Sequence, residues 1–308
     1  WSSDVCSSDL FMRSDPSGLR LIDRADSFAE RTALLAPEGV FTFDDLMRAS
    51  ANAATGLLAG RDDLAGARVC YLVPPGWEYT AVQWGVWRAG GFGVPLATSH
   101  PETELAWVLD DAEPEAVIAH PSLAGRLRGL TAERKIPLLL TPVLLRDGPV
   151  AHFPTLPESR NALMLYTSGT TGRPKGVVLT HANLRAQVEA LSEAWGWSQD
   201  DHILLHLPLH HVHGILNGVG CALAVRATCE MLPEFDAELR FVPLLDDQEI
   251  ATLGPGRAIW HGAGSRAPEC PIPPWRGFRA RKRSVERRNS LGPLGWGRIP
   301  KSLLRDCD

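Results

Sequence analysis

The sequence predicts an α/β protein in which βαβ units build largely parallel sheets. Short apolar runs typical of strands alternate with stretches of helical length from about residue 20 onward, and glycines or prolines separate many of them. The 308 residues are 44% hydrophobic and 22% charged, which are ordinary values for folded proteins and exclude general disorder. At roughly 150 residues per domain, this length allows two domains or one large unit.

The first helix is predicted from its start signal. Thr42 is followed by Asp45 in a pattern similar to a capping box, and Gly60 is well placed to end the helix. Apolar or small residues then recur at the spacing of one helical face, at Leu46, Ala49, Ala53 and Leu57.

The remaining elements follow the same alternation. The predicted strands are 67–73, 92–96, 116–119, 163–167 and 177–179, and the predicted helices are 79–89, 101–112 and one that starts after Thr180. Pro101 suits a first helical turn, and the polar, proline-bearing stretch 145–160 is expected to be a loop.

Cysteine usage predicts an intracellular, cytoplasmic protein. The six cysteines form neither a CxxC pair nor a regular framework, so buried free thiols are expected at Cys6, Cys70, Cys221, Cys229, Cys270 and Cys307. No secretory signal is seen. The longest apolar runs, 136–145 and 215–225, fall short of the roughly 18 residues that a membrane span needs.

The first ten residues fit nothing that follows. Residues 1–10 repeat Ser-Ser-Asp at a spacing of five and show neither a helical nor a strand period. We expect a foreign or disordered leader there and exclude it from the fold.

A glycine-rich loop between two strands is the most informative stretch. The loop contains Ser168, Gly169, Thr170, Thr171, Gly172 and Lys175, directly after Thr167. Glycines let backbone N–H groups approach a ligand closely, the hydroxyls add donors, and the lysine adds a mobile positive charge. This inventory predicts a site for a triphosphate.

The spacing excludes a Walker A loop, which needs Gly-x4-Gly-Lys at the start of a helix. Counting from Gly169 places Pro174 at the second glycine position, and counting from Gly172 places Val177 there. A strand also follows the loop before any helix, so the scaffold must be a different one.

Residues 166–176, Tyr-Thr-Ser-Gly-Thr-Thr-Gly-Arg-Pro-Lys-Gly, resemble the signature loop of the AMP-forming acyl-CoA synthetases, the adenylate-forming ligase superfamily. The resemblance extends over about residues 20–240. It implies the incomplete N-terminal adenylation domain of that fold over residues 11–240. It also implies that the β- and γ-phosphates of ATP are bound by Thr167, Ser168, Gly169, Thr170, Thr171, Gly172 and Lys175.

A histidine-rich segment follows, with His206, His210, His211 and His213 close together. A zinc site is one interpretation, but Pro208 prevents a continuous helix and no carboxylate or cysteine stands at ligand spacing. Scattered structural histidines are a second interpretation. The third is the resemblance, in which Pro-Leu-His-His-Val-His-Gly is similar to a core motif that places His211 and Gly214 at the acyl and adenylate pocket.

The run 207–235 is most similar to malonyl-CoA synthetases, which implies malonate or methylmalonate as the acid. The arginine expected to meet a second carboxylate is not identifiable.

The resemblance ends in the last part of the chain. Residues 284–290 stand where a Tyr-Gly-x-Thr-Glu motif is expected, so the family's magnesium-associated glutamate is absent. The resemblance would also place a C-terminal lid domain, its lysine and much of the coenzyme A channel further along, and we expect these 308 residues not to include them. No catalytic residue and no metal ligand is therefore assigned.

Charge changes at the same place. Residues 271–308 hold 10 of the 31 Lys and Arg but only 3 of the 36 Asp and Glu, although the formal net charge is −5. The basic run 279–288 admits a nucleic-acid tail, a solvated face, or a corrupted or frame-shifted end. We favour the last for residues 241–308, because composition and resemblance change together.

The sequence thus predicts a fragment of an acid–CoA ligase that uses ATP, Mg²⁺ and coenzyme A to activate a small carboxylic acid. The alternatives are a non-catalytic nucleotide-binding or interaction module, or a nucleic-acid binder with a basic tail. The main hypothesis includes no nucleic acid and no membrane as partners, and the sequence does not indicate the oligomeric state.

Overall fold

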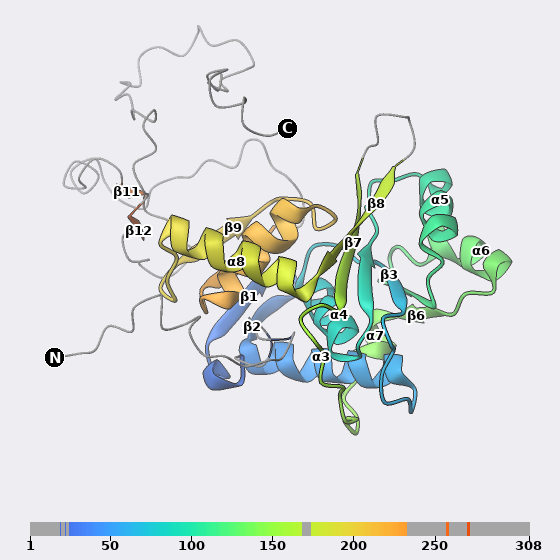
Figure 1. Cartoon of the computed structure of the whole chain (residues 1–308), viewed down its shortest axis with the longest axis horizontal. Coiled ribbons are helices and arrows are strands. Elements are labelled where there is room, and N and C mark those ends of the chain that lie inside the picture. Colours follow the sequence, from blue (N-terminus) through green and yellow to red (C-terminus); the bar gives the residue numbers. More distant parts are fainter. Residues whose placement is uncertain are drawn as a thin grey trace, which may run out of the picture. The chain divides into compact units, whose positions relative to one another are not determined.

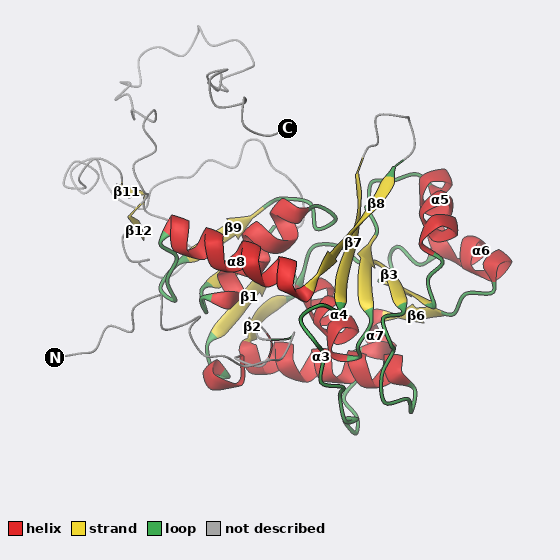
Figure 2. Cartoon of the chain, viewed as in Figure 1, coloured by secondary structure: helices red, strands yellow, loops and turns green. Residues whose placement is uncertain are grey.

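The computed structural model describes residues 25–167 and 174–232, with Leu19, Ile22 and two short antiparallel strands, β11 (Arg257–Ala258) and β12 (Cys270–Pro271). All of these belong to one compact unit, Trp1–Pro273. The other described strands form one sheet of six strands and one of four (Figures 1 and 2). The expectations for residues 1–10 and for the basic run 279–288 lie outside the described residues, as does nearly all of 241–308.

The six-stranded sheet has the order β6-β5-β3-β4-β7-β8. Its strands are β3 (Arg68–Leu72), β4 (Phe92–Pro95), β5 (Ala116–Ala119), β6 (Leu138–Leu140), β7 (Asn161–Thr167) and β8 (Lys175–Thr180). Every pairing is parallel except that of β7 with β8, so the predicted largely parallel sheet is confirmed. The crossover helices are α4 (Trp77–Arg88), α5 (Glu102–Ala112) and α6 (Gly125–Arg134).

Strand β3 is buried on both faces because helices cover both sides of this sheet. Val69 and Tyr71 join the core beneath α3 (Phe43–Leu58) and α4, whereas Cys70 and Leu72 join a second core with α5 and α6. This alternation follows from the two-residue period of a strand. It also explains the near-continuous apolar run, which is typical of a central parallel strand.

The second sheet has the order β2-β1-β10-β9 and was not predicted. Its strands are β1 (Thr32–Ala36), β2 (Gly39–Thr42), β9 (His202–Leu205) and β10 (Thr228–Met231), and the short 3-10 helix η1 (Ala25–Phe28) precedes them. Strand β1 pairs in parallel with β10. Strands of four or five residues are too short to show a clear alternation of apolar and polar residues. The pairing of β1 with β10 also joins segments that are far apart in the chain, so no local signal predicts it.

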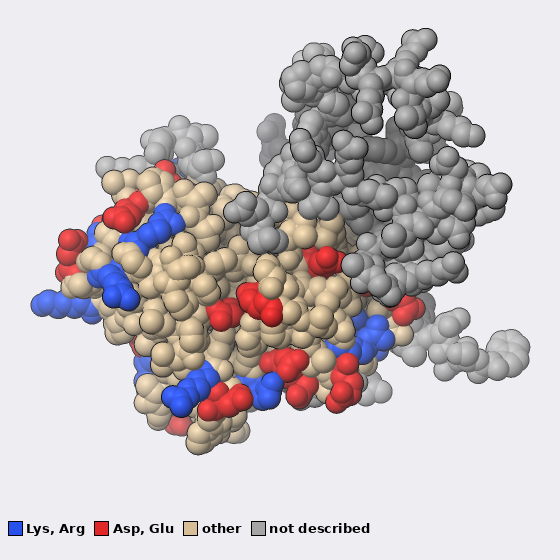
Figure 3. All heavy atoms as spheres, turned by 180° about the vertical axis from the view of Figure 1, so that it is seen from behind, with Lys and Arg blue, Asp and Glu red and all other residues tan. Residues whose placement is uncertain are grey.

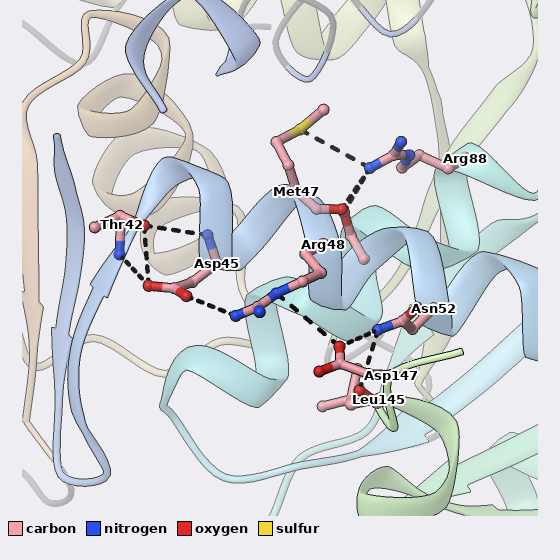
Figure 4. Close-up of polar contacts among 9 residues, drawn as sticks. Thr42, Asp45, Met47, Arg48, Asn52, Arg88, Leu145 and Asp147 are labelled. Atoms are coloured by element: carbon pink, nitrogen blue, oxygen red, sulfur yellow. Dashed lines mark hydrogen bonds and ion pairs between the residues drawn. The ribbon is translucent and has the colours of Figure 1, made fainter. Parts of the chain in front are cut away.

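The predicted start of α3 is confirmed. The Thr42 hydroxyl accepts from the Asp45 amide at 3.2 Å, and the Asp45 carboxylate accepts from the Thr42 amide at 2.9 Å, which lowers the pKa of Asp45. Figure 4 shows the same helix tied to its surroundings: Arg88 of α4 donates to the Met47 carbonyl, and Asn52 donates to Asp147. Helix α3 ends one residue before the left-handed Ala59.

The remaining elements are α7 (Thr141–Leu144), α8 (His181–Trp195), the π-helical η2 (His213–Gly220) and α9 (Cys221–Ala224). The expected loop 145–160 and the expected helix after Thr180 are confirmed. None of the helices in the described ranges is long and apolar enough to cross a membrane. Cys70, Cys221 and Cys229 are free and buried, as expected, and burial raises the pKa of the Cys221 thiol to about 11. The side chains of the other three cysteines fall outside the described part.

Helices α3 and α4 approach so closely that only glycine fits at position 85. A Cβ there would overlap the Ala53 side chain and lie 3.1 Å from the Ser50 carbonyl oxygen. We expect Gly85→Ala to lower the free energy of unfolding by about 1–3 kcal/mol through overpacking. Urea denaturation measures this change.

Gly129→Ala is the matched control, because Gly129 is also inside a helix but has nothing within 4 Å of the place that a Cβ would occupy. The higher helix propensity of alanine should stabilise the fold by up to about 1 kcal/mol. Equal gains from both substitutions would contradict the close contact between α3 and α4.

Candidate functional site

The chain reverses its path across the six-stranded sheet at β3. It leaves β3 toward β4 on one side and then crosses back to β5 on the other. In open parallel sheets, ligands bind in the crevice outside the carboxyl ends of the strands at such a reversal. A binding site is therefore expected at this edge of β3 and β4.

A pocket of about 210 Å³ lies at this edge. Val73 and Pro75 line it after β3, and Thr98 and Ser99 line it after β4. The remaining wall comes mainly from segment 206–210, which follows β9 of the other sheet. We call this pocket the switch-point crevice; it combines apolar walls with hydroxyl and imidazole groups.

The predicted phosphate loop connects β7 to β8, and we call these two strands with their loop the phosphate hairpin. Thr167 ends β7 and pairs with Lys175 at the start of β8, and both residues are exposed. The strand after the loop confirms that the scaffold is not that of a Walker A motif. Ser168, Gly169, Thr170, Thr171 and Gly172 lie outside the described residues, so their phosphate contacts stay predictions.

The phosphate hairpin and the switch-point crevice share one edge of the sheet. Strand β7 runs parallel to β4 with Leu163 opposite Gly93. Thr167, at the carboxyl end of β7, therefore lies at the same edge of the sheet as the carboxyl end of β4, after which Thr98 lines the crevice. Lys175 lies at this edge too, because it pairs with Thr167.

Tyr166 anchors the base of the hairpin to α5. Its hydroxyl donates to the Asp111 carboxylate at 2.7 Å, and its ring meets Trp107 edge to face with centroids 5.6 Å apart. Burial, followed by the hydrogen bond and the charge of Asp111, raises the pKa of Tyr166. The hydroxyl therefore stays protonated and remains a donor at neutral pH.

The histidine segment is divided by exposure. His206, His211 and His213 are exposed, whereas His210 is half-buried; of the four, His206 and His210 line the switch-point crevice. The ring centroid of His210 lies 4.1 Å from that of His211 and 5.8 Å from that of His100. Burial first, then these two imidazoles, lowers the pKa of His210 to about 4, so the ring is neutral at pH 7.

Metal binding finds no support within residues 25–167 and 174–232. No three His, Cys, Asp or Glu side chains of the described part are grouped so that they could hold a metal ion. His202, just before the segment, instead pairs with Glu230 across β9 and β10 at 2.8 Å, which is a structural role.

Gly214 is buried and lets the helical segment η2 begin against the turn at Pro208. A Cβ on Gly214 would overlap the Pro208 carbonyl oxygen and lie 3.0 Å from the Pro208 carbonyl carbon. The amide of Ile215 donates to the His211 carbonyl at 3.1 Å, which ties His211 to the start of η2. His211 does not line the crevice, and its predicted role with Gly214 in an acyl pocket stays a prediction.

Several polar residues at this edge were not singled out from the sequence. The short run Thr98 to His100 directly follows a correctly predicted strand, so its place at a carboxyl edge could have identified it. Tyr79 and Gln83 gave no such signal, because the hydroxyl of Tyr79 meets the carbonyl of Leu209, 130 residues away.

Acidic and basic side chains of the described residues lie interspersed on the face seen in Figure 3. The basic run 279–288, on which the nucleic-acid alternative depends, lies outside the described residues, so that alternative stays untested.

Relatives of the chain are found among ligases that act with coenzyme A. The AMP-binding enzyme family matches residues 21–254. The mitochondrial malonate–CoA ligase of Xenopus laevis is 41% identical over 227 residues, covering 70% of this chain and 39% of that protein. The human mitochondrial malonate–CoA ligase is 38% identical over 239 residues, covering 73% of this chain and 41% of that protein. The chain thus spans about two fifths of the length of these relatives.

Solved structures agree on the fold. ATP-bound MatB from Rhodopseudomonas palustris superposes with a TM-score of 0.64 at 28% identity, over 71% of this chain and 45% of that one. The N-terminal domain of FACL13 from Mycobacterium tuberculosis superposes with a TM-score of 0.64 at 25% identity, over 71% of this chain and 57% of that one.

Proposed function

Because the chain belongs to the AMP-binding enzyme family, we propose that it is the nucleotide- and acid-binding part of an AMP-forming acid–CoA ligase. In the reaction proposed for the whole enzyme, the carboxylate of the acid attacks the α-phosphorus of ATP and releases pyrophosphate. The thiol of coenzyme A then displaces AMP from the acyl-adenylate and forms the thioester. Activation is needed because a free carboxylate is a poor electrophile.

The observation that carries the proposal is the shared edge of the phosphate hairpin and the switch-point crevice. In-line attack requires the acid beside the α-phosphorus while the β- and γ-phosphates are held further along. Thr167 and Lys175 stand at the same carboxyl edge of the sheet as Thr98 and Ser99, which line the crevice after β4. Lys175 would offset phosphate charge as pyrophosphate forms.

Magnesium is proposed only as a partner of the ATP phosphates. The described side chains contain no group of three metal-ligating residues, so they do not fit a resident metal, and no step is assigned to one. Coenzyme A is proposed as the second co-substrate on the family resemblance.

Malonate is the favoured acid, and methylmalonate is the alternative. The Xenopus laevis and human relatives are called malonate–CoA ligases, and the similarity to malonyl-CoA synthetases seen in the sequence includes the histidine segment. The cytoplasmic location inferred from the cysteines stays a prediction, and the names of these relatives place those proteins in mitochondria.

Calorimetric titration of the 308-residue chain tests the proposal. We expect saturable binding of MgATP, and tighter binding of malonate than of propanoate, which has the same number of carbons but a single carboxylate. Failure to bind MgATP would overturn the proposal. MgATP binding with no detectable malonate binding would instead favour the non-catalytic nucleotide-binding module.

A further inference from the structure

We propose that Tyr79 is a positioning residue that holds the histidine segment 206–211 at the switch-point crevice through a hydrogen bond to the Leu209 carbonyl. The proposal deepens the proposed function and rests on it only for the use of this segment in acid binding. The geometry that carries it involves three buried side chains and one buried carbonyl.

The key contact joins two distant parts of the chain. Tyr79 lies in the first turn of α4 and is 3% exposed, and its hydroxyl donates to the Leu209 carbonyl at 2.5 Å. Leu209 is buried, whereas the residues on either side of it are partly or fully exposed. The backbone bond from the His211 amide to the Pro208 carbonyl is long, at 3.4 Å, and stays within the segment, so it does not tie the segment to α4.

The Tyr79 hydroxyl has a second acceptor within reach. The Oε1 atom of Gln83 lies 3.2 Å from the Tyr79 hydroxyl and accepts from the Tyr71 hydroxyl at 3.1 Å. The two tyrosine rings meet edge to face with centroids 5.4 Å apart. A phenol has one proton to donate, and the shorter contact assigns that of Tyr79 to Leu209.

Burial keeps this donor protonated. It raises the pKa of Tyr79 and of Tyr71 well above the ordinary value for tyrosine, so neither hydroxyl ionises near neutral pH. The Tyr79 hydroxyl therefore remains a hydrogen-bond donor to the Leu209 carbonyl and does not act as an acid or base near neutral pH.

Loss of the Tyr79 hydrogen bond would affect the neighbouring imidazoles of His210 and His211. His210 follows Leu209 in the chain and lines the crevice, and His211 comes next. Removing the Tyr79 hydroxyl would leave the Leu209 carbonyl buried without this donor, and the segment would move outward to hydrate it. His210 would then lose much of the burial that keeps it neutral.

Tyr79→Phe tests the proposal, with Tyr71→Phe as the matched control. Both substitutions remove one buried phenol oxygen that contacts Gln83, but only the first removes a donor to Leu209. The readout is the imidazole proton signal of His210 in the 308-residue chain, followed by NMR against pH.

We expect Tyr79→Phe to raise the pKa of His210 by about one unit toward its ordinary value, and Tyr71→Phe to leave it unchanged. The other titratable groups that face His210 are His211 and His100, and His100 in turn lies 3.5 Å from Glu104. An unchanged His210 titration in folded Tyr79→Phe would overturn the proposal and reduce Tyr79 to a packing residue.

A second measurement covers the case in which Tyr79→Phe does not fold. The chain has three tyrosines, so labelling with 3-fluorotyrosine gives three fluorine signals. Pro208→Gly should loosen the segment and shift the Tyr79 signal while leaving that of Tyr166 in place; an unmoved Tyr79 signal contradicts the proposal. Neither ATP nor acid is used, so failure here is distinct from failure of the proposed function.

Discussion

Lys175→Ala is expected to weaken MgATP binding by about ten- to a hundredfold while leaving the free energy of unfolding unchanged. Hydrogen bonds to charged groups contribute about 1.5–3 kcal/mol, and each 1.4 kcal/mol is a factor of about ten in affinity. Lys175 is exposed at the start of β8, so its truncation opens no cavity. Calorimetric titration measures the affinity, and urea denaturation measures the stability.

Lys135→Ala is the control for charge. Lys135 is exposed and its loss changes the net charge equally. It precedes β6, which runs parallel to β5, so it stands at the amino edge of the sheet, opposite the phosphate hairpin. We expect this variant to bind MgATP as the unaltered chain does. Equal weakening by both substitutions would mean that overall charge, and not the hairpin, sets the affinity.

Gly214→Ala is expected to disrupt the turn beneath the histidine segment and lower the free energy of unfolding by about 3 kcal/mol, at the upper end for overpacking. The added methyl would overlap the Pro208 carbonyl oxygen and approach the Leu207 oxygen to 3.2 Å. These are backbone atoms, so relief requires the segment itself to move. Malonate binding should fall in the same variant, because His210 moves with the segment.

Gly218→Ala is the matched control. It adds a methyl group elsewhere in η2 and so separates the clash at Pro208 from the general cost of an added methyl group in this helix. The nearest atom to its added Cβ is the Cδ1 tip of Leu205 at 2.5 Å, the flexible end of a side chain that can rotate away. Urea denaturation should therefore show a smaller loss than in Gly214→Ala, and malonate binding should be retained. Similar losses in the two variants would show that the Pro208 turn is not the constraint.

Much of the six-stranded sheet was predictable because its signals are local. The capping pair Thr42 and Asp45 acts over three residues, and the strand and helix periods act over a few residues more. The phosphate hairpin was found in the same way, since two strands and an intervening glycine-rich loop lie in one continuous stretch. Thr98 and Ser99 needed only the added rule that ligands gather at carboxyl edges.

The second sheet could not be predicted on these grounds. Its pairing of β1 with β10 depends on contacts between residues as distant in the chain as Leu34 and Cys229. Short strands of this kind become stable only when a distant partner supplies their hydrogen bonds and their core. The helical η2 was likewise hidden, because its apolar run resembles a strand or a buried helix equally well.

The sequence by itself determined the α/β class, the parallel βαβ order, the phosphate hairpin and the family, since each depends on residues close together in the chain. The tertiary structure alone decided that His210 rather than His211 lines the crevice, and that Tyr79 holds Leu209 beside it. The physical reason is that burial and long-range hydrogen bonds arise between segments joined only by folding. Such contacts produce no periodic pattern in the sequence of either segment.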